Sequence, residues 1–194
     1  AGGADWRDGI IWAVHRARMF PDYHAYAEKM ARDYDYPHLH KLDREGLRAL
    51  VGSPAYHGGV LDMGGGHLHP LAYALGLARA AQGAGVRLHE TSRVTAIRPG
   101  EPATVETDSG APIRARFVAL GCNGYLGGLE PQVAARVMPI NNFIAATRPL
   151  TAPERDSVLS GGHAVADSKF VINYFRLSSD DRLLFGGGES YGYR

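Results

Sequence analysis

The chain has 194 residues, of which 45% are hydrophobic and 21% charged, so it can bury a core and is neither fibrous nor disordered. Its formal net charge of +1 excludes the strong positive field of a nucleic-acid-binding or membrane-surface protein. A single cysteine excludes a disulfide framework and a multi-cysteine zinc site, and favours the cytoplasm. We expect no membrane helix and no signal peptide, since neither pattern occurs.

The first third of the chain is expected to alternate between strands and helices. Residues 9–20 read as a strand or the start of a helix. Apolar residues three and four apart predict a helix over 22–34. A short helix should run from Asp43, its N-cap, to Leu50. Residues 56–63 are consistent with a strand.

The middle of the chain has the order of an α/β unit. Pro70 fits the first turn of a helix that Gly83 and Gly85 would end, and a strand region should follow over 86–97. This order of helix, glycine turn and strand is the second half of such a unit.

A hairpin is predicted next, around Asp108-Ser109-Gly110. Its return strand should end in the apolar run 117–120, which is typical of a strand buried on both faces. Later elements are a strand over 137–150, a loop over 151–166, and a second hairpin formed by 170–177 and 183–186.

Three glycine clusters each follow a predicted strand: Gly64–Gly66, Gly121 with Gly124, and Gly186–Gly188. Glycine is entropically costly, so a run indicates positive φ or the close approach of a flat group. Ordinary turns and backbone gathered around a planar ligand are both open interpretations. No G-x-G-x-x-G or Walker-type phosphate motif occurs.

Several polar residues are candidates with competing interpretations. His67 and His69 could bind a metal with Asp62, but no further His or Cys supports this, and we expect no metal site. They could instead pack at the start of a helix or face a substrate or flavin. Cys122 is a nucleophile only with a basic partner, so an inert thiol is favoured.

On the last hairpin, Arg176 could pair with a substrate carboxylate and Glu189 with an ammonium group. Each could equally be a surface charge.

Several runs resemble one family, in order and over nearly the whole chain. They include Gly66-His-Leu-His-Pro70, Phe117-Val-Ala-Leu-Gly-Cys-Asn-Gly-Tyr125, Arg136-Val-Met-Pro-Ile-Asn-Asn142, Asn173-Tyr-Phe-Arg-Leu-Ser178 and Leu184-Phe-Gly-Gly-Gly-Glu-Ser-Tyr191. The chain resembles the FAD-dependent oxidoreductases of the D-amino-acid oxidase superfamily, and most of all the γ-glutamylputrescine oxidase branch.

The resemblance implies an α/β (mixed α+β) flavoprotein of two domains. Residues 67–128 would form part of a Rossmann-like FAD domain. Residues 1–66 and 129–194 would form a mixed, largely antiparallel sheet with helices that covers the flavin and binds the amine.

The resemblance also implies roles for individual residues. The expected cofactor-binding residues are Val94, Gly121, Cys122, Asn123, Gly124, Gly65, Gly66 and His67. The expected substrate-binding residues are His69, Tyr174, Arg176, Gly187, Gly188 and Glu189. No catalytic residue is assigned, because the flavin performs the hydride transfer.

The family's N-terminal G-x-G-x-x-G segment and C-terminal glycine-rich segment are not found in this sequence. We therefore expect a piece of an enzyme that oxidises a small amine or amino acid with FAD and forms peroxide on reoxidation, inactive alone. The alternative is a stand-alone module that binds a small ligand or partner without catalysis. Exposed edges would favour self-association.

Overall fold

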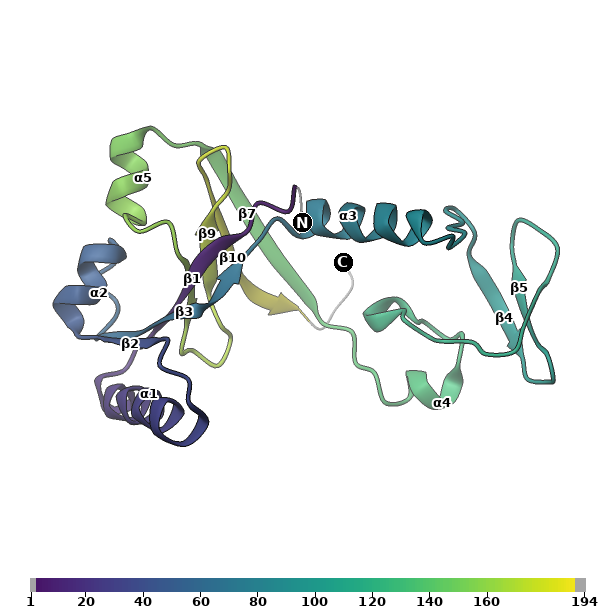
Figure 1. Ribbon diagram of the computed structural model, residues 1–194, viewed down its shortest axis with the longest axis horizontal. Helices are drawn as coiled ribbons and strands as arrows, with labels where there is room; N and C mark the ends of the chain where they lie inside the picture. The colour runs from purple at the N-terminus through teal and green to yellow at the C-terminus, as the bar shows by residue number, and fades with distance from the viewer. Residues whose placement is uncertain (1–2, 191–194) are drawn as a thin grey trace. The chain divides into compact units, whose positions relative to one another are not determined.

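The computed structural model describes residues 3–190 (Figure 1). The chain forms two compact units, Ala1–Arg79 with Asn142–Glu189, and Ala80–Asn141 with Ser190–Arg194. We call them the first and the second unit. Assigning substrate and cofactor binding to 1–66, 67–128 and 129–194 stays a prediction. Within the described residues, none of the helices has both the length and the apolar character that a membrane crossing requires.

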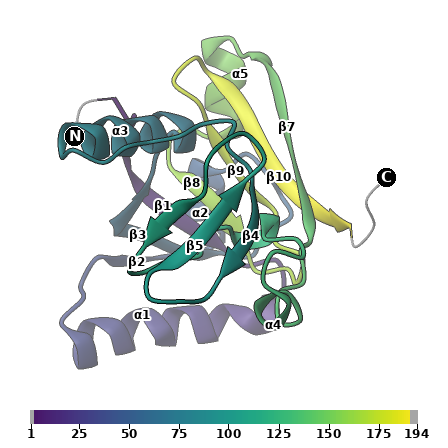
Figure 2. The same cartoon turned by 90° about the vertical axis from the view of Figure 1, so that its right-hand side faces the viewer.

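The first unit is built on a seven-stranded sheet of order β2-β3-β1-β8-β9-β10-β7. Its strands are β1 (Arg7–Ala13), β2 (Leu39–Leu42), β3 (Gly59–His67), β7 (Asn141–Pro149), β8 (Ala164–Asp167), β9 (Tyr174–Leu177) and β10 (Arg182–Ser190). Strands β1 and β8 run parallel, whereas β3 is antiparallel to β1 and β2, and β9 is antiparallel to β8 and β10. Figure 2 shows β7 beside β10 at one edge. The predicted mixed fold with a largely antiparallel sheet is confirmed.

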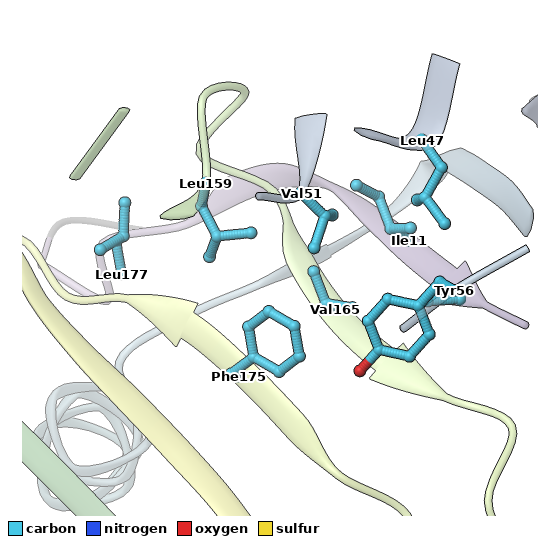
Figure 3. Close-up of a cluster of buried hydrophobic side chains, with 9 residues drawn as sticks. Ile11, Leu47, Val51, Tyr56, Leu159, Val165, Phe175 and Leu177 are labelled. Carbon is cyan, nitrogen blue, oxygen red and sulfur yellow. The ribbon is translucent and has the colours of Figure 1, made fainter. Parts of the chain in front are cut away.

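One face of this sheet carries the core of the first unit. Buried side chains from the strands pack there against α2 (Arg44–Leu50) and the end of α5 (Ala152–Val158). Figure 3 labels eight residues of this core, from the strands, from α2 and from the loops: Ile11, Leu47, Val51, Tyr56, Leu159, Val165, Phe175 and Leu177. Because successive residues of a strand point to opposite faces, Trp12, Tyr174 and Arg176 point away from this core. Helix α1 (Phe20–Tyr34) packs against β2 and β3 on the side away from α2 (Figure 1).

Local signals explain both helices predicted in the first third of the chain. Helix α1 has a proline in its first turn and ends at Asp35, whose φ of 50° lies in the left-handed region. Helix α2 begins after Asp43, whose Oδ1 accepts a hydrogen bond from the backbone N–H of Gly46 at 2.7 Å. The predicted helices over 22–34 and 43–50 are confirmed.

The prediction of a loop over 151–166 was wrong. This segment contains α5 and β8. The Glu154 carboxylate accepts a hydrogen bond from the backbone N–H of Thr151 at 2.8 Å, which is half of a capping box. The Thr-x-x-Glu spacing was therefore the overlooked signal for α5. Strand β8 is only four residues long and forms because β1 and β9 pair with it on either side.

The second unit contains a three-stranded antiparallel sheet of β4 (Val94–Arg98), β5 (Ala103–Thr107) and β6 (Ile113–Ala115). The predicted hairpin around Asp108–Gly110 joins β5 to β6. Helix α3 (Pro70–Gly83) leads into this unit where it was predicted, but none of its residues is buried. The short elements η1 (Ala17–Met19), η2 (Asn123–Tyr125) and α4 (Pro131–Ala134) complete the described chain.

Two further strand predictions were wrong in the second unit. Residues 86–88 are not in a strand, and the apolar run 117–120 has no strand structure. Phe117 is 87% exposed. An apolar run becomes a buried strand only when other strands flank it, and no strand in the described part of the chain pairs with this one.

The core described above predicts the cost of removing one of its side chains. Leu47 is 1% exposed, so Leu47→Ala should lower the free energy of unfolding by about 2–5 kcal/mol, through lost burial and the cavity that remains. Leu77→Ala, at a residue of α3 that is 53% exposed, should change it by about 1 kcal/mol or less. Urea unfolding of both variants measures the difference, and equal effects would place the core elsewhere.

Tyr56 predicts a loss of stability at alkaline pH. Burial, followed by the nearby Asp167 carboxylate, raises the pKa of Tyr56 from its ordinary 10.0 to about 12. The folded state therefore keeps a proton that the unfolded state loses, and stability falls as the pH rises from 10.0 to about 12. Tyr56→Phe should reduce this fall, and the exposed Tyr34→Phe should not. Unfolding curves across that range decide it, and an unchanged slope in Tyr56→Phe would refute the assignment.

Candidate functional site

The predicted substrate-binding residues Tyr174 and Arg176 lie in β9, beside the glycines of β10. Tyr174 pairs with Gly186, and its ring covers that glycine so closely that a Cβ there would lie 2.2 Å from it. The Tyr174 hydroxyl donates a hydrogen bond to Oδ1 of Asn142. The glycine thus makes room for the ring, and the hydrogen bond fixes its tip.

The glycine clusters at 64–66 and 186–188 were predicted to follow strands. They lie instead inside β3 and β10. The glycines of β3 lie where its pairing with β1 is irregular, opposite Gly9. Asp8 pairs with Gly66, but Ile10, two residues on, pairs with Asp62, so the register shifts between them. A Cβ at Gly64 would lie 2.2 Å from the Tyr36 hydroxyl, and one at Gly66 would lie 2.5 Å from the Trp6 ring.

Aromatic rings of the protein itself therefore occupy the Cβ side of Gly64, Gly66 and Gly186, which gives these glycines a packing role. The approach of a planar ligand to the glycine clusters stays a prediction. Gly188 differs. Its φ of 72° requires glycine, and no atom of the described residues lies within 4 Å of its missing Cβ. Its neighbour Glu189 is exposed. Gly188 and Glu189 are thus exposed, whereas Gly187 is half-buried and a Cβ there would lie 2.7 Å from Oδ1 of Asn173.

His67, predicted to bind the cofactor, is buried at the end of β3. Its Nε2 lies 3.1 Å from the carbonyl oxygen of Gly162, and its Nδ1 is buried without a hydrogen-bond partner among the described residues. Burial lowers the pKa of His67, and the nearby Arg176 and Arg7 lower it further. The ring is therefore neutral. Because a carbonyl only accepts, Nε2 carries the proton and Nδ1 presents an acceptor lone pair.

Arg176 belongs to the same group of charges as His67. Burial lowers the pKa of its guanidinium, which Asp5 partly offsets. Within the described part of the chain, Arg176 has no carboxylate within ion-pair distance, and it donates to the Leu177 carbonyl at 3.3 Å. Asp5 pairs with Arg7 at 3.7 Å, and its Oδ2 is buried without a hydrogen-bond partner among residues 3–190. The half-buried guanidinium is thus short of anionic partners.

The structure brings together His67, predicted to contact cofactor, and Arg176, predicted to contact substrate. We call these two residues with Asp5 and Arg7 the polar cluster. Asp5 and Arg7 were missed by the sequence reasoning, because pairing of β1 with β3 places them there and no motif marks them. Arg7 is the register partner of His67.

His69 has a structural role in this structure. Its Nδ1 accepts a hydrogen bond from the backbone N–H of Ala72 at 3.3 Å, at the start of α3. This matches the interpretation of a histidine at a helix start. The residues that the structure describes contain no group of three His, Cys, Asp or Glu able to hold a metal ion.

Two of the predicted cofactor residues of the second unit line one cavity, and Gly121, Asn123 and Gly124 are next to Cys122 in the chain. Val94 and Cys122 both line it, and its volume is about 570 Å³. The Cys122 thiol is free and half-buried. In the part of the chain that the structure describes, no atom lies within 4 Å of the missing Cβ of Gly121, and Asn123 and Gly124 continue the same loop as η2. Most of the remaining wall is apolar, and Arg93 is its one charged residue among those described.

Comparison with known proteins gives the family of the chain and the share of its relatives' length that the chain covers. The sequence model of the DAO family, described as FAD dependent oxidoreductase, matches residues 2–194. The chain is 46% identical over 189 residues to a probable oxidoreductase OrdL of Rhizobium meliloti (strain 1021), covering 96% of the chain and 43% of that protein. It is 36% identical over 191 residues to the gamma-glutamylputrescine oxidoreductase of Escherichia coli (strain K12), covering 98% and 44%. The chain thus spans less than half the length of these curated relatives.

Solved structures show the same fold at low sequence identity. Glycine oxidase from Geobacillus kaustophilus matches with a TM-score of 0.74 and 19% identity, over 96% of this chain and 49% of that one. L-proline dehydrogenase from P. horikoshii matches with a TM-score of 0.76 and 15% identity, over 98% and 52%. With the sequence match over residues 2–194, these findings confirm the predicted resemblance: the chain belongs to the DAO family of FAD-dependent oxidoreductases.

Proposed function

We propose that the chain supplies the substrate-binding face, and part of the FAD site, of an enzyme that oxidises amines or amino acids. The polar cluster is the observation that carries this proposal. It holds a half-buried guanidinium without an ion-pair partner among the described residues and a buried imidazole nitrogen that accepts no hydrogen bond. Leaving such groups unsatisfied is costly, so a bound polar ligand would stabilise them.

The chemistry of the cluster fits an amino-acid donor. The planar Arg176 fork suits a carboxylate, which it can bind through two parallel hydrogen bonds. The Nδ1 lone pair of His67 can accept a hydrogen bond from an amine N–H. Tyr174, held by Asn142, would form part of the wall beside the donor. These residues bind and orient the donor.

The cavity of the second unit fits part of FAD. Its apolar walls suit a flat ring such as adenine, and the open backbone at Gly121 allows close approach. When bound, FAD supplies the hydride acceptor. Nothing in the sequence provides a helix N-terminus with a phosphate-binding glycine motif, which would be the main contact for the pyrophosphate. We therefore propose that stable FAD binding and activity require more of the relatives' length than this chain spans.

This proposal predicts that the chain alone does not retain FAD. After incubation with FAD and removal of free cofactor, its visible spectrum should lack a flavin band. A full-length protein containing this chain should show the band, and anaerobic addition of an amine or amino acid should bleach it. A band retained by the chain alone would refute the need for further segments. A flavin that no such donor bleaches would refute the substrate class.

Arg176 distinguishes amino-acid donors from simple amines. In the full-length protein, Arg176→Gln should lower kcat/KM for an amino acid by roughly 10- to 100-fold, the value of a charge-assisted hydrogen-bonded pair. Activity on an amine without a carboxylate should change little. Arg182→Gln is the matched control, since Arg182 lies in the same hairpin and pairs with Asp180 at 2.7 Å. Equal losses for both donors would mean that Arg176 maintains the fold of the site.

A further inference from the structure

A second cavity lies within the first unit, between α1 and the strands β1, β2 and β3. Its volume is about 600 Å³, within the usual range for small-molecule sites. None of the residues predicted to bind cofactor or substrate lines it. We call it the α1 cavity.

Aromatic side chains form much of its wall. Tyr23 and Tyr26 are three residues apart in α1, so they lie on one face of the helix. Trp12 faces them from β1, on the side of the sheet away from the core, and Tyr36 follows the helix. Trp12 is 40% exposed, so the cavity opens to solvent.

Two carboxylates complete the wall. The Oδ1 atom of Asp62 is fixed by three donors: the Tyr36 hydroxyl at 2.7 Å and the backbone N–H groups of Gly64 at 2.9 Å and Gly65 at 3.2 Å. No donor in the described residues reaches its Oδ2. Asp22 lies in the first turn of α1 and is exposed.

The two aspartates give the α1 cavity a negative charge that no basic residue in its described wall balances. Among the described residues, no Lys, Arg or His lines it, whereas both aspartates do. Lys41, on β2, pairs instead with Glu28 at 2.5 Å on the outside of α1. A ligand that satisfies the cavity must therefore be positively charged and also have an apolar body for the aromatic walls.

We propose that the α1 cavity binds an organic cation of the alkylammonium class. The ammonium group would pair with Asp62, Asp22 would add to the negative charge of the cavity, and the faces of Trp12 and the tyrosines would attract the cation and cover its alkyl chain. This site goes beyond the proposed oxidation, because it involves none of the polar cluster and needs no FAD. An anion would meet two carboxylates, and a neutral ligand would leave them unpaired.

The fluorescence of Trp12 reports directly on ligand binding in the α1 cavity. The sequence has two tryptophans, so Trp6→Phe leaves Trp12 as the only one. In that background, titration with n-hexylammonium at constant ionic strength should give a saturable change in fluorescence. The isosteric neutral 1-hexanol should bind about tenfold more weakly or worse, because it lacks the charge-assisted contacts. Similar binding of both would overturn the proposal, as would the absence of any saturable change.

Charge variants test which residues bind the ammonium. Asp62→Asn should weaken n-hexylammonium binding about tenfold. Asp22→Asn should weaken it severalfold, and it keeps the test valid if Asp62→Asn loosens the glycine turn, because no hydrogen bond within the described residues depends on Asp22. Asp33→Asn, on α1 but outside the cavity, should have no effect.

Unchanged affinity in both cavity variants would overturn the assignment of the cation to the carboxylates. A Trp12 signal that changes with protein concentration in the absence of ligand would show that a second copy of the chain occupies the cavity, and would also overturn it.

Discussion

The buried carboxylate of Asp167 fixes the start of β9, and the proposed substrate-binding face depends on this interaction. It lies at the end of β8 and accepts hydrogen bonds from the backbone N–H groups of Lys169 at 3.1 Å and Asn173 at 3.0 Å, and from Nδ2 of Asn173 at 2.9 Å. The Tyr56 hydroxyl donates to it at 3.4 Å. These donors offset the cost of burying a charge, and they fix the chain where β9 begins. Because Tyr174 follows Asn173 directly, Asp167 sets the position of the ring and, through β9, of Arg176.

Successive side chains of each strand point to opposite faces of the sheet, so the residues of the core and the residues proposed to bind ligands lie on different faces. In β9, Phe175 and Leu177 enter the core, while Tyr174 and Arg176 point to the opposite face. In β1, Ile11 is in the core and Trp12 lines the α1 cavity. The residues proposed to bind ligands thus lie at alternate strand positions, on the face of the sheet opposite the core.

The sequence predicted those elements that are determined by contacts between residues close together in the chain. It did not predict those that depend on distant segments. The caps at Asp43 and Asp35 and the final hairpin are local signals, so these elements were predicted correctly. The run 117–120 was not, because its burial depends on flanking strands that its own composition cannot specify. Likewise Gly64–Gly66 were expected to follow a strand, either as a turn or as backbone near a planar ligand, since nothing local shows that Trp6 and Tyr36 pack on them. His67 and Arg176 were named through the family resemblance, but Asp5 and Arg7 join them only through strand pairing.

The neutral state of His67 has a consequence for how the polar cluster responds to acidity. A histidine with an ordinary pKa would gain a charge in mildly acidic solution, whereas burial delays that event in His67 to lower pH. Near neutrality the cluster therefore keeps a constant protonation pattern, with a charged guanidinium beside an uncharged imidazole. Any change in ligand binding by the polar cluster over that range is therefore expected to follow the titration of the ligand rather than that of His67.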